Sequence, residues 1–322
     1  MRIARLLRAA AVVLPAASAL GARAQDAWPN RAVRVIVPFA PGGPPDLAAR
    51  LLGRKLQEKW GQTVIVDNRP GGAGNIGAAA VARAEPDGYT VLATSSALPV
   101  NVTLFDKPGY ALSDFQTVAV PVVTPNILIA AANLKQKTLV DVARAAKTEN
   151  FSYASPGIGT TPHLAGELIF RVINKLDIRH APFAGAGPAV AAVLAGQLPL
   201  GVAALPAAIE NVKTGAVTGL AVTTAKRLPD LPDVPTVAET GMGDVEAVTS
   251  VGIYLPAKTP TAILDKLNAD INAVVSSGAL DKAFKTAGFT SMTLGRAEAR
   301  AYVEAEKSKW AVVIQSAAIK PE

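Results

Sequence analysis

The spacing of apolar residues over positions 31–94 predicts alternating strands and helices. Residues 31–39 carry a near-continuous β-branched run, which is typical of a strand buried on both faces. Residues 46–60 place leucines at helical spacing and end at Gly61, which indicates an amphipathic helix. Strands over 63–66 and 89–94, with a helix over 81–84, continue the pattern. This β-α-β-α-β order predicts a mostly parallel sheet covered by helices.

A second series of elements follows a long crossover. Its predicted strands cover 127–131, 151–154, 180–183 and 220–223, and its predicted helices cover 139–148, 162–174 and 188–195. Two helices, one starting at Thr259-Pro260 and one over 296–317, end the chain. With crossovers near 118–126 and 248–255, this layout predicts an α/β protein of two lobes. Residues 25–122 and 252–322 would form lobe 1, and residues 123–251 lobe 2.

The N-terminus has the order of a secretory signal peptide. Three arginines within residues 2–8 precede an apolar stretch over 9–20, and Ala22-Arg23-Ala24 is a small-x-small cleavage site. About 12 apolar residues are too few for a transmembrane helix, which needs roughly 20. A buried N-terminal helix is the alternative, but it explains neither the arginines before the apolar stretch nor the cleavage site after it. We therefore expect cleavage of residues 1–24, a mature chain from Gln25, and a free periplasmic monomer with no lipid anchor, since no cysteine follows the cleavage site.

Composition narrows the function further. The chain has no cysteine and two histidines without a metal-binding spacing, so no metal site, cofactor or disulfide is expected. Its net charge of +7 falls once the signal arginines leave, and the remaining basic residues are scattered, which argues against nucleic-acid binding. No nucleophile elbow is present, so we expect a binding protein and not an enzyme. The run Gly72–Gly77 fits a dinucleotide fingerprint, but the next strand ends in Ser95-Ser96 instead of an acid.

Three glycine-rich loops each follow a predicted strand and open a helix. They cover residues 39–46, 155–163 and 183–188, and none contains Lys or Arg. Helix N-termini present backbone N–H groups and a partial positive charge, and glycine lets an anion approach them closely. In α/β sheets, ligands gather at the carboxyl ends of the strands. The loops therefore predict an anion site built from backbone and hydroxyl donors, although each loop taken alone could be a simple tight turn.

Six segments in this order resemble the Bug family of periplasmic binding proteins, which includes the receptors of tripartite tricarboxylate transporters. They are VPFAPGGPPDLAARLL (37–52), VDNRPGGAGNIGAAAVARAEPDGYTVL (66–92), SYASPGIGTTPHLAGELIF (152–170), PFAGAGPAVAAVLAGQ (182–197), GLAVTTAKRLPDLPDVPTVAETG (219–241) and YLPAKTPTAILDKLNADI (254–271). The resemblance implies a Venus-flytrap fold, type II-like, in which two lobes close on a small carboxylate.

The resemblance also implies which residues contact the ligand. In lobe 1 these are Phe39, Pro41, Gly42, Gly43, Asp46, Ser95 and Ser96. In lobe 2 they are Ser155, Gly157, Gly159, Thr160, Thr161, His163, Phe183, Ala184 and Gly185. The chain departs from the family where Gln197 is followed by Leu198-Pro199-Leu200 instead of an acidic residue, which biases the far end of the pocket toward apolar groups.

Three of these residues have two readings. Asp46 either stabilises the first turn of its helix or orients a water or a ligand donor group. His163 either points into the cleft or is satisfied on its own helix. Phe39 is either a cleft wall or part of the core.

The expected function is capture of a small carboxylate for membrane permease subunits. The ligand class stays open among dicarboxylates, tricarboxylates, aromatic acids and acidic amino acids. The alternative is a sensory adaptor that presents the bound ligand to a membrane signalling receptor.

Overall fold

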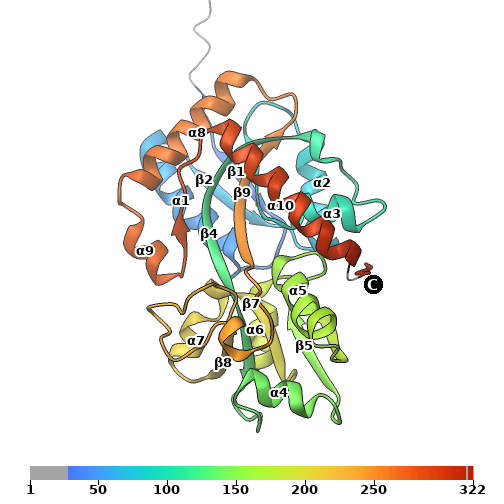
Figure 1. The fold of residues 1–322 in the computed structure, drawn as a ribbon. Helices are drawn as coiled ribbons and strands as arrows, with labels where there is room; N and C mark the ends of the chain where they lie inside the picture. The colour runs from blue at the N-terminus through green and yellow to red at the C-terminus, as the bar shows by residue number, and fades with distance from the viewer. Residues whose placement is uncertain (1–27, 317, 322) are drawn as a thin grey trace, which may run out of the picture.

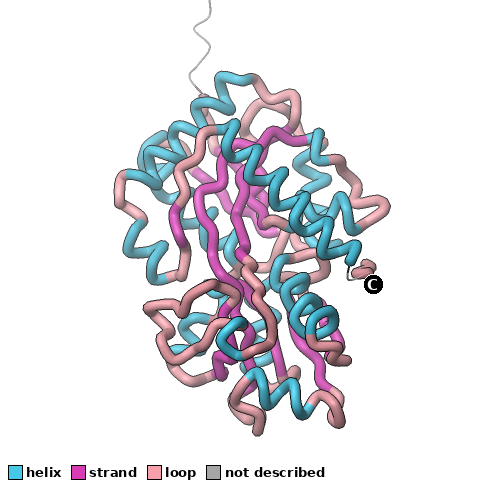
Figure 2. The backbone as a smooth tube through the Cα atoms, in the orientation of Figure 1, coloured by secondary structure: helices cyan, strands magenta, loops and turns pink. Residues whose placement is uncertain are grey.

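The computed structural model describes residues 28–316 and 318–321, so the predicted signal peptide lies outside the described residues. The described strands form one continuous path in the order β2-β1-β3-β9-β4-β7-β5-β6, with β10 and β8 pairing onto β4. Figures 1 and 2 show two groups of strands, one above the other, with β4 running through both. Their bounds are β1 Val33–Val37, β2 Val64–Asn68, β3 Thr90–Ser95, β4 Phe115–Ala131, β5 Phe151–Ser155, β6 Ile178–Pro182, β7 Leu200–Ala204, β8 Val217–Val222, β9 Val248–Pro256 and β10 Thr290–Ser291.

Helices flank both groups of strands. In the upper group of Figure 1, α1 and α8 bury their apolar faces against β1, β3, β4 and β9, while α2, α3 and α10 lie toward the opposite face. The helices are α1 Pro44–Trp60, α2 Asn75–Ala82, α3 Ala97–Leu104, α4 Leu139–Ala145, α5 Thr161–Gly166, α6 Ala186–Leu194, α7 Ile209–Lys213, α8 Thr261–Ser276, α9 Asp281–Thr286 and α10 Arg296–Ser316. Predicted strands β1, β2 and β3 are parallel to one another, as are β5 and β6, and β7 adds a further parallel strand beside β5. The α/β class is therefore confirmed.

Each group of strands also contains an antiparallel pairing with a crossover strand, β9 against β3 in the first group and β4 against β7 in the second. The first part of β4 pairs with β9 up to Pro125, and from Asn126 onward β4 pairs with β7 and β8. Each group of strands is therefore a mixed sheet. The predicted crossover at 118–126 and the predicted strand at 127–131 are two halves of one strand.

Asn126 lies fully buried at the point where β4 changes sheets. Its backbone N–H donates to the hydroxyl of Thr223 at 3.0 Å, and its carbonyl accepts from the backbone N–H of Thr223 at 3.0 Å. Its side-chain Nδ2 donates to the carbonyl of Ala247 at 3.3 Å, and its Oδ1 accepts from the Thr249 hydroxyl at 2.7 Å. The backbone of Asn126 thus ties the residue after β8 to the crossover of β4, and its side chain ties Ala247 and the start of β9 to the same point.

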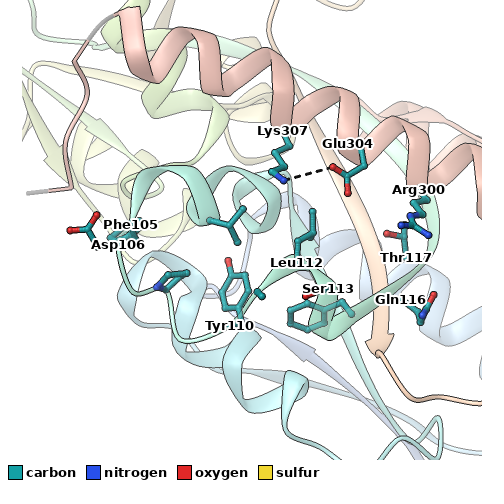
Figure 3. Close-up of a pocket in the computed structure, with 14 residues that line it drawn as sticks. Phe105, Asp106, Tyr110, Leu112, Ser113, Gln116, Thr117, Arg300, Glu304 and Lys307 are labelled. Carbon is teal, nitrogen blue, oxygen red and sulfur yellow. Dashed lines mark ion pairs between the residues drawn. The ribbon is translucent and has the colours of Figure 1, made fainter.

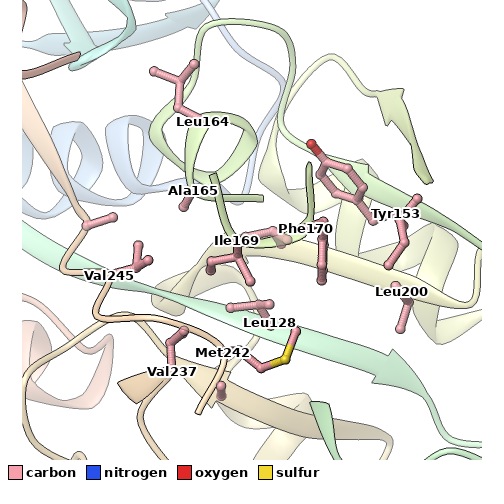
Figure 4. Close-up of a cluster of buried hydrophobic side chains, with 14 of the residues drawn as sticks. Leu128, Tyr153, Leu164, Ala165, Ile169, Phe170, Leu200, Val237, Met242 and Val245 are labelled. Carbon is pink, nitrogen blue, oxygen red and sulfur yellow. The ribbon is translucent and has the colours of Figure 1, made fainter. Parts of the chain in front are cut away.

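The lower group of strands has its own core. Figure 4 shows part of it, where Leu128 and Leu200 of β4 and β7 meet Ile169 and Phe170 of the segment after α5. That segment, Glu167–Ile173, is a π-helix, which continues α5 and so fulfils most of the predicted helix over 162–174. The last turns of α10 reach this core through Trp310, so the C-terminal helix packs against both groups of strands.

Several elements differ from the sequence predictions, and three of them have a clear physical reason. The helix predicted over 81–84 starts earlier, at Asn75, because the left-handed backbone of the glycine-rich turn ends at Gly74. Helix α3 was not predicted, since its residues are apolar on nearly every side and include Pro99. Strand β7 was not predicted either, because its sequence LGVAA has small side chains with weak strand preference.

Candidate functional site

The first predicted loop connects β1 to α1 and is held in shape by Asp46. The carboxylate accepts from the backbone N–H of Gly42 at 3.0 Å, from Arg50 Nε at 3.0 Å and from Asn68 Nδ2 at 3.0 Å. Asn68 also donates to the carbonyl of Phe39 at 3.1 Å. Gly42 has a φ of +90°, a conformation that favours glycine, so the turn needs this residue at this point.

Burial and hydrogen bonding shift the pKa of Asp46 in opposite directions. Burial alone would raise the pKa of its carboxyl, but the hydrogen bonds from Arg50, Gly42 and Asn68 outweigh it and hold the pKa below its ordinary value. Both carboxylate oxygens are engaged within the loop. Asp46 therefore holds the loop between β1 and α1 in place, a structural role that differs from the first-turn stabilisation considered from the sequence.

The helix that follows offers few donors. Helix α1 begins with Pro44 and Pro45, which have no N–H, so its first turn cannot present the usual set of backbone donors. This corrects the expectation that each of the three helix starts is rich in N–H groups. Gly43 and the start of α6, at Ala186 and Gly187, carry backbone N–H groups instead.

The second predicted loop follows β5 and is braced by its own polar groups. The Ser155 hydroxyl accepts from the backbone N–H of Gly157 at 3.1 Å and lies 2.6 Å from Nε2 of His180. The Thr160 hydroxyl donates to the carbonyl of Gly157 at 2.6 Å. Thr161 bonds through its hydroxyl to Thr249 of β9, a residue that the motif search did not find. These side chains fix the loop against the crossover strand.

The two histidines of the chain lie together beneath this loop. Their rings stand 4.2 Å apart between centroids, and Nδ1 of His163 accepts from the backbone N–H of Gly159 at 3.2 Å. Burial lowers the pKa of His163 to about 3, with a contribution from His180, and burial lowers the pKa of His180 to about 4. Both rings are therefore neutral at neutral pH. The sequence motifs pointed to His163 but not to His180, which reaches the loop through the pairing of β6 with β5.

The predicted loops of the two halves meet directly. The backbone N–H of Ala40 donates to the carbonyl of Ala184 at 2.8 Å, which joins the first loop to the third. A methyl group placed on Gly187 would lie 2.5 Å from the carbonyl oxygen of Pro41, and one placed on Gly43 would lie 3.5 Å from the Ala186 side chain. Residues far apart in the sequence thus come together at one point between the two halves.

A further contact joins α3 to the second loop. Nδ2 of Asn101 donates to the carbonyl of Ala73 at 3.0 Å and to Oδ1 of Asn75 at 2.8 Å, which fixes the orientation of the amide. Its Oδ1 is buried without a hydrogen-bond partner and faces Gly159. The hydroxyl of Ser96, one of the predicted contacts, is likewise buried and unpartnered. The predicted Ser95 hydroxyl accepts from the backbone N–H of Ala97 at 3.3 Å.

A small cavity of about 20 Å³ lies between the loops. Ligand pockets usually measure about 300–1,000 Å³, so the loops are apposed here more closely than a closed form with bound ligand would allow. The described residues that line the cavity come from both groups of strands and from all three glycine-rich loops. The lining consists of Phe39, Gly43, Pro44, Pro45, Ser95, Pro156, Thr160, Pro162, Ala186, Ala204 and Thr249.

A larger hollow of about 670 Å³ lies away from these loops, beside the start of β4. Figure 3 shows Tyr110 and Gln116 on one side of it and Arg300, Glu304 and Lys307 of α10 on the other. Its described lining includes no residue of the three glycine-rich loops. We base the candidate site on the small cavity, because its walls come from both groups of strands and from all three loops.

The fold and the meeting of loops from its two halves define the class of two-lobed solute-binding proteins. Residues 48–319 match the family described as "Tripartite tricarboxylate transporter family receptor", and the chain belongs to that family. It is a periplasmic solute-binding receptor of this type. In the described part of the chain, every helix is too short or too polar to cross a membrane.

Relatives of known sequence or structure agree with this assignment. Protein BugT of Bordetella pertussis is 32% identical over 325 residues, which cover 99% of each chain. The structure of the periplasmic binding protein BugD superposes with a TM-score of 0.87 at 31% identity, over 92% of this chain and 100% of that one. The R. palustris protein Rpa4515 with adipate superposes with a TM-score of 0.87 at 32% identity, again over 92% and 100%.

The role of Asp46 in holding the first loop can be tested by Asp46→Asn. We expect this change to lower the free energy of unfolding by about 1–3 kcal/mol at pH 7, since bonds to a buried charge are replaced by weaker ones. Because the folded-state pKa is depressed, the contribution is present above the ordinary pKa and is lost as pH falls through the folded value. Urea unfolding at pH 7 and pH 3 should therefore show a smaller difference in the free energy of unfolding between wild type and variant at pH 3.

Asp265→Asn is the matched control, since Asp265 forms an exposed ion pair with Arg296. Its effect should stay below about 1 kcal/mol at both pH values. A gap between wild type and Asp46→Asn that does not shrink with falling pH would show that the ionised carboxylate does not hold the loop.

Proposed function

We propose that this protein captures a small carboxylate between two lobes in the periplasm and delivers it to permease subunits of a tripartite tricarboxylate-type transporter. The lobes are residues 25–122 with 252–322, and residues 123–251. The bond from Ala40 to Ala184 carries the proposal, because it brings the donor loops of both lobes to one point. The similar R. palustris protein Rpa4515, whose structure was solved with adipate, supports a carboxylate as the ligand class.

The proposal includes binding without chemical turnover. The Ser155 hydroxyl and His180 lie within hydrogen-bond distance, an arrangement that in another setting could activate a nucleophile. Here, however, the hydroxyl is fully buried and accepts from Gly157 of its own loop, which gives the pair a bracing role. The protein acts as a monomer and receives its ligand by closure, since a ligand that contacts both lobes stabilises the closed form over the open one.

Recognition of the carboxylate itself can be measured with an ester. A thermal-shift screen of small carboxylates should identify ligands that raise the unfolding temperature. The methyl ester of the tightest ligand should then bind at least tenfold more weakly in calorimetry, because each lost bond to the charge is worth about 1.5–3 kcal/mol. Equal affinity for acid and ester would refute a carboxylate-reading site, and consumption of the acid during a long incubation would refute the pure binding role.

Lobe closure can be tested at Gly187, which lies in α6 against the opposite loop. Gly187→Ala keeps helical backbone geometry and favours the helix by about 1 kcal/mol, but its methyl group would collide with Pro41. We expect unchanged or higher thermal stability together with at least tenfold weaker ligand binding. Small-angle scattering should show ligand-induced compaction in the wild type and less in the variant.

Gly295→Ala is the control for this closure test, because a methyl group there meets only the end of the Glu298 side chain at 3.4 Å. It should bind and compact like the wild type. Normal binding and compaction by Gly187→Ala would place the ligand site away from the meeting point of the loops.

Export can be checked on protein expressed with its full N-terminus. N-terminal sequencing of the periplasmic fraction should give a chain that begins at or near Gln25. Recovery of residues 1–24 on a product confined to the cytoplasm would contradict a cleaved signal peptide.

A further inference from the structure

The walls of the candidate site are poor in charged side chains and in unpaired side-chain donors. Among the described residues lining the cavity none is charged, and the apolar ones include an aromatic ring and four prolines. These are Phe39, Pro44, Pro45, Pro156, Pro162, Ala186 and Ala204. A ligand that parts the loops would therefore have its middle and its far end against apolar side chains.

The polar residues of the second lobe and of the crossover strand are already paired. The Thr160 hydroxyl donates to Gly157, and the Thr249 hydroxyl donates to Oδ1 of Asn126. His163 accepts from Gly159 through Nδ1, and His180 is bound to the Ser155 hydroxyl. Both rings are buried and neutral at neutral pH. Among the described residues, this half of the site therefore has no cation to hold a second carboxylate.

Donors gather instead at one place, where the first loop meets the start of α6. Gly43 and Ala186 lie against each other there, and both carry backbone N–H groups. On the side of the first group of strands, Ser95 lines the cavity, and the Ser96 hydroxyl is buried with 1% exposure and has no partner. The prolines at the start of α1 add no N–H. This set suits a single carboxylate.

We propose that the ligand is a monocarboxylate with an apolar body, aliphatic or aromatic, whose one carboxylate is held at Gly43, Ala186 and Ser95. This inference rests on the proposed function and narrows its ligand class. A second carboxylate at the far end would lose its water and meet no charged side chain among the described lining residues, whereas an apolar end gains from burial.

Hexanoate and adipate form the decisive pair of probes, because they share a six-carbon chain and differ only in a methyl or a carboxylate at the far end. Calorimetry on the wild-type protein at pH 7 should give at least tenfold tighter binding for hexanoate. Benzoate and terephthalate repeat the comparison on an aromatic body, with benzoate expected to be the tighter ligand. Equal or tighter binding of adipate and terephthalate would overturn the inference.

A variant should reverse the preference. Ala204 lies at the end of β7 in the cavity wall, so Ala204→Arg places a cation where the far end of the ligand would lie. We expect adipate to gain and hexanoate to lose affinity, so that their ratio falls at least tenfold. Ala207→Arg, three residues along and outside the cavity wall, should keep the wild-type ratio, and far-ultraviolet circular dichroism checks that each variant is folded.

The remaining outcomes separate this inference from the proposed function. If dicarboxylates or citrate bind while hexanoate and benzoate do not, the receptor function stands and the monocarboxylate inference fails. If no carboxylate of a broad panel binds to the wild type, the proposed function itself fails. If Ala204→Arg is misfolded, the inference is tested by the wild-type affinities alone, hexanoate against adipate and benzoate against terephthalate.

Discussion

The hydrogen bonds of Asn126 fix the geometry on which the rest of the molecule depends. A fully buried amide is stable only when its donors and acceptors are paired, and here the partners come from the end of β8 and the start of β9. The strand that carries Asn126 is the one that belongs to both sheets. Polar contacts at the crossover therefore help to set how the two groups of strands, and the glycine-rich loops they carry, are placed relative to each other.

The loops themselves follow from a constraint on charge. A site that binds an anion without Lys or Arg has to use backbone and hydroxyl donors, which are individually weak in water and stronger when water is excluded. Exclusion of water needs a second wall, which the other lobe would supply in the proposed closed form. Charged residues near the loops bond instead to other protein groups. The ion pair of Asp46 with Arg50, for example, ties the first loop to α1.

Much of this arrangement could be predicted from the chain itself. The β-branched runs of β1 and β4 and the leucine spacing of α1 indicated the class of fold, because burial dictates those patterns. The three glycine-rich loops were found for the same reason, since their backbone conformations restrict the residue type. Asn101, Thr249 and His180 were not found, because each reaches the site from a separate element through tertiary contacts that leave no local motif.

The bond between Ala40 and Ala184 has a consequence for how occupancy can be reported. Part of the interaction between the lobes is made by protein groups alone, so closure has a favourable contribution that does not depend on ligand. The observed affinity then reflects both the intrinsic contacts and the resting balance between open and closed forms. A membrane partner that recognised closure alone would also engage protein without cargo. To distinguish the ligand-bound protein from the empty closed form, such a partner would have to recognise the separation of the two loops that the ligand imposes.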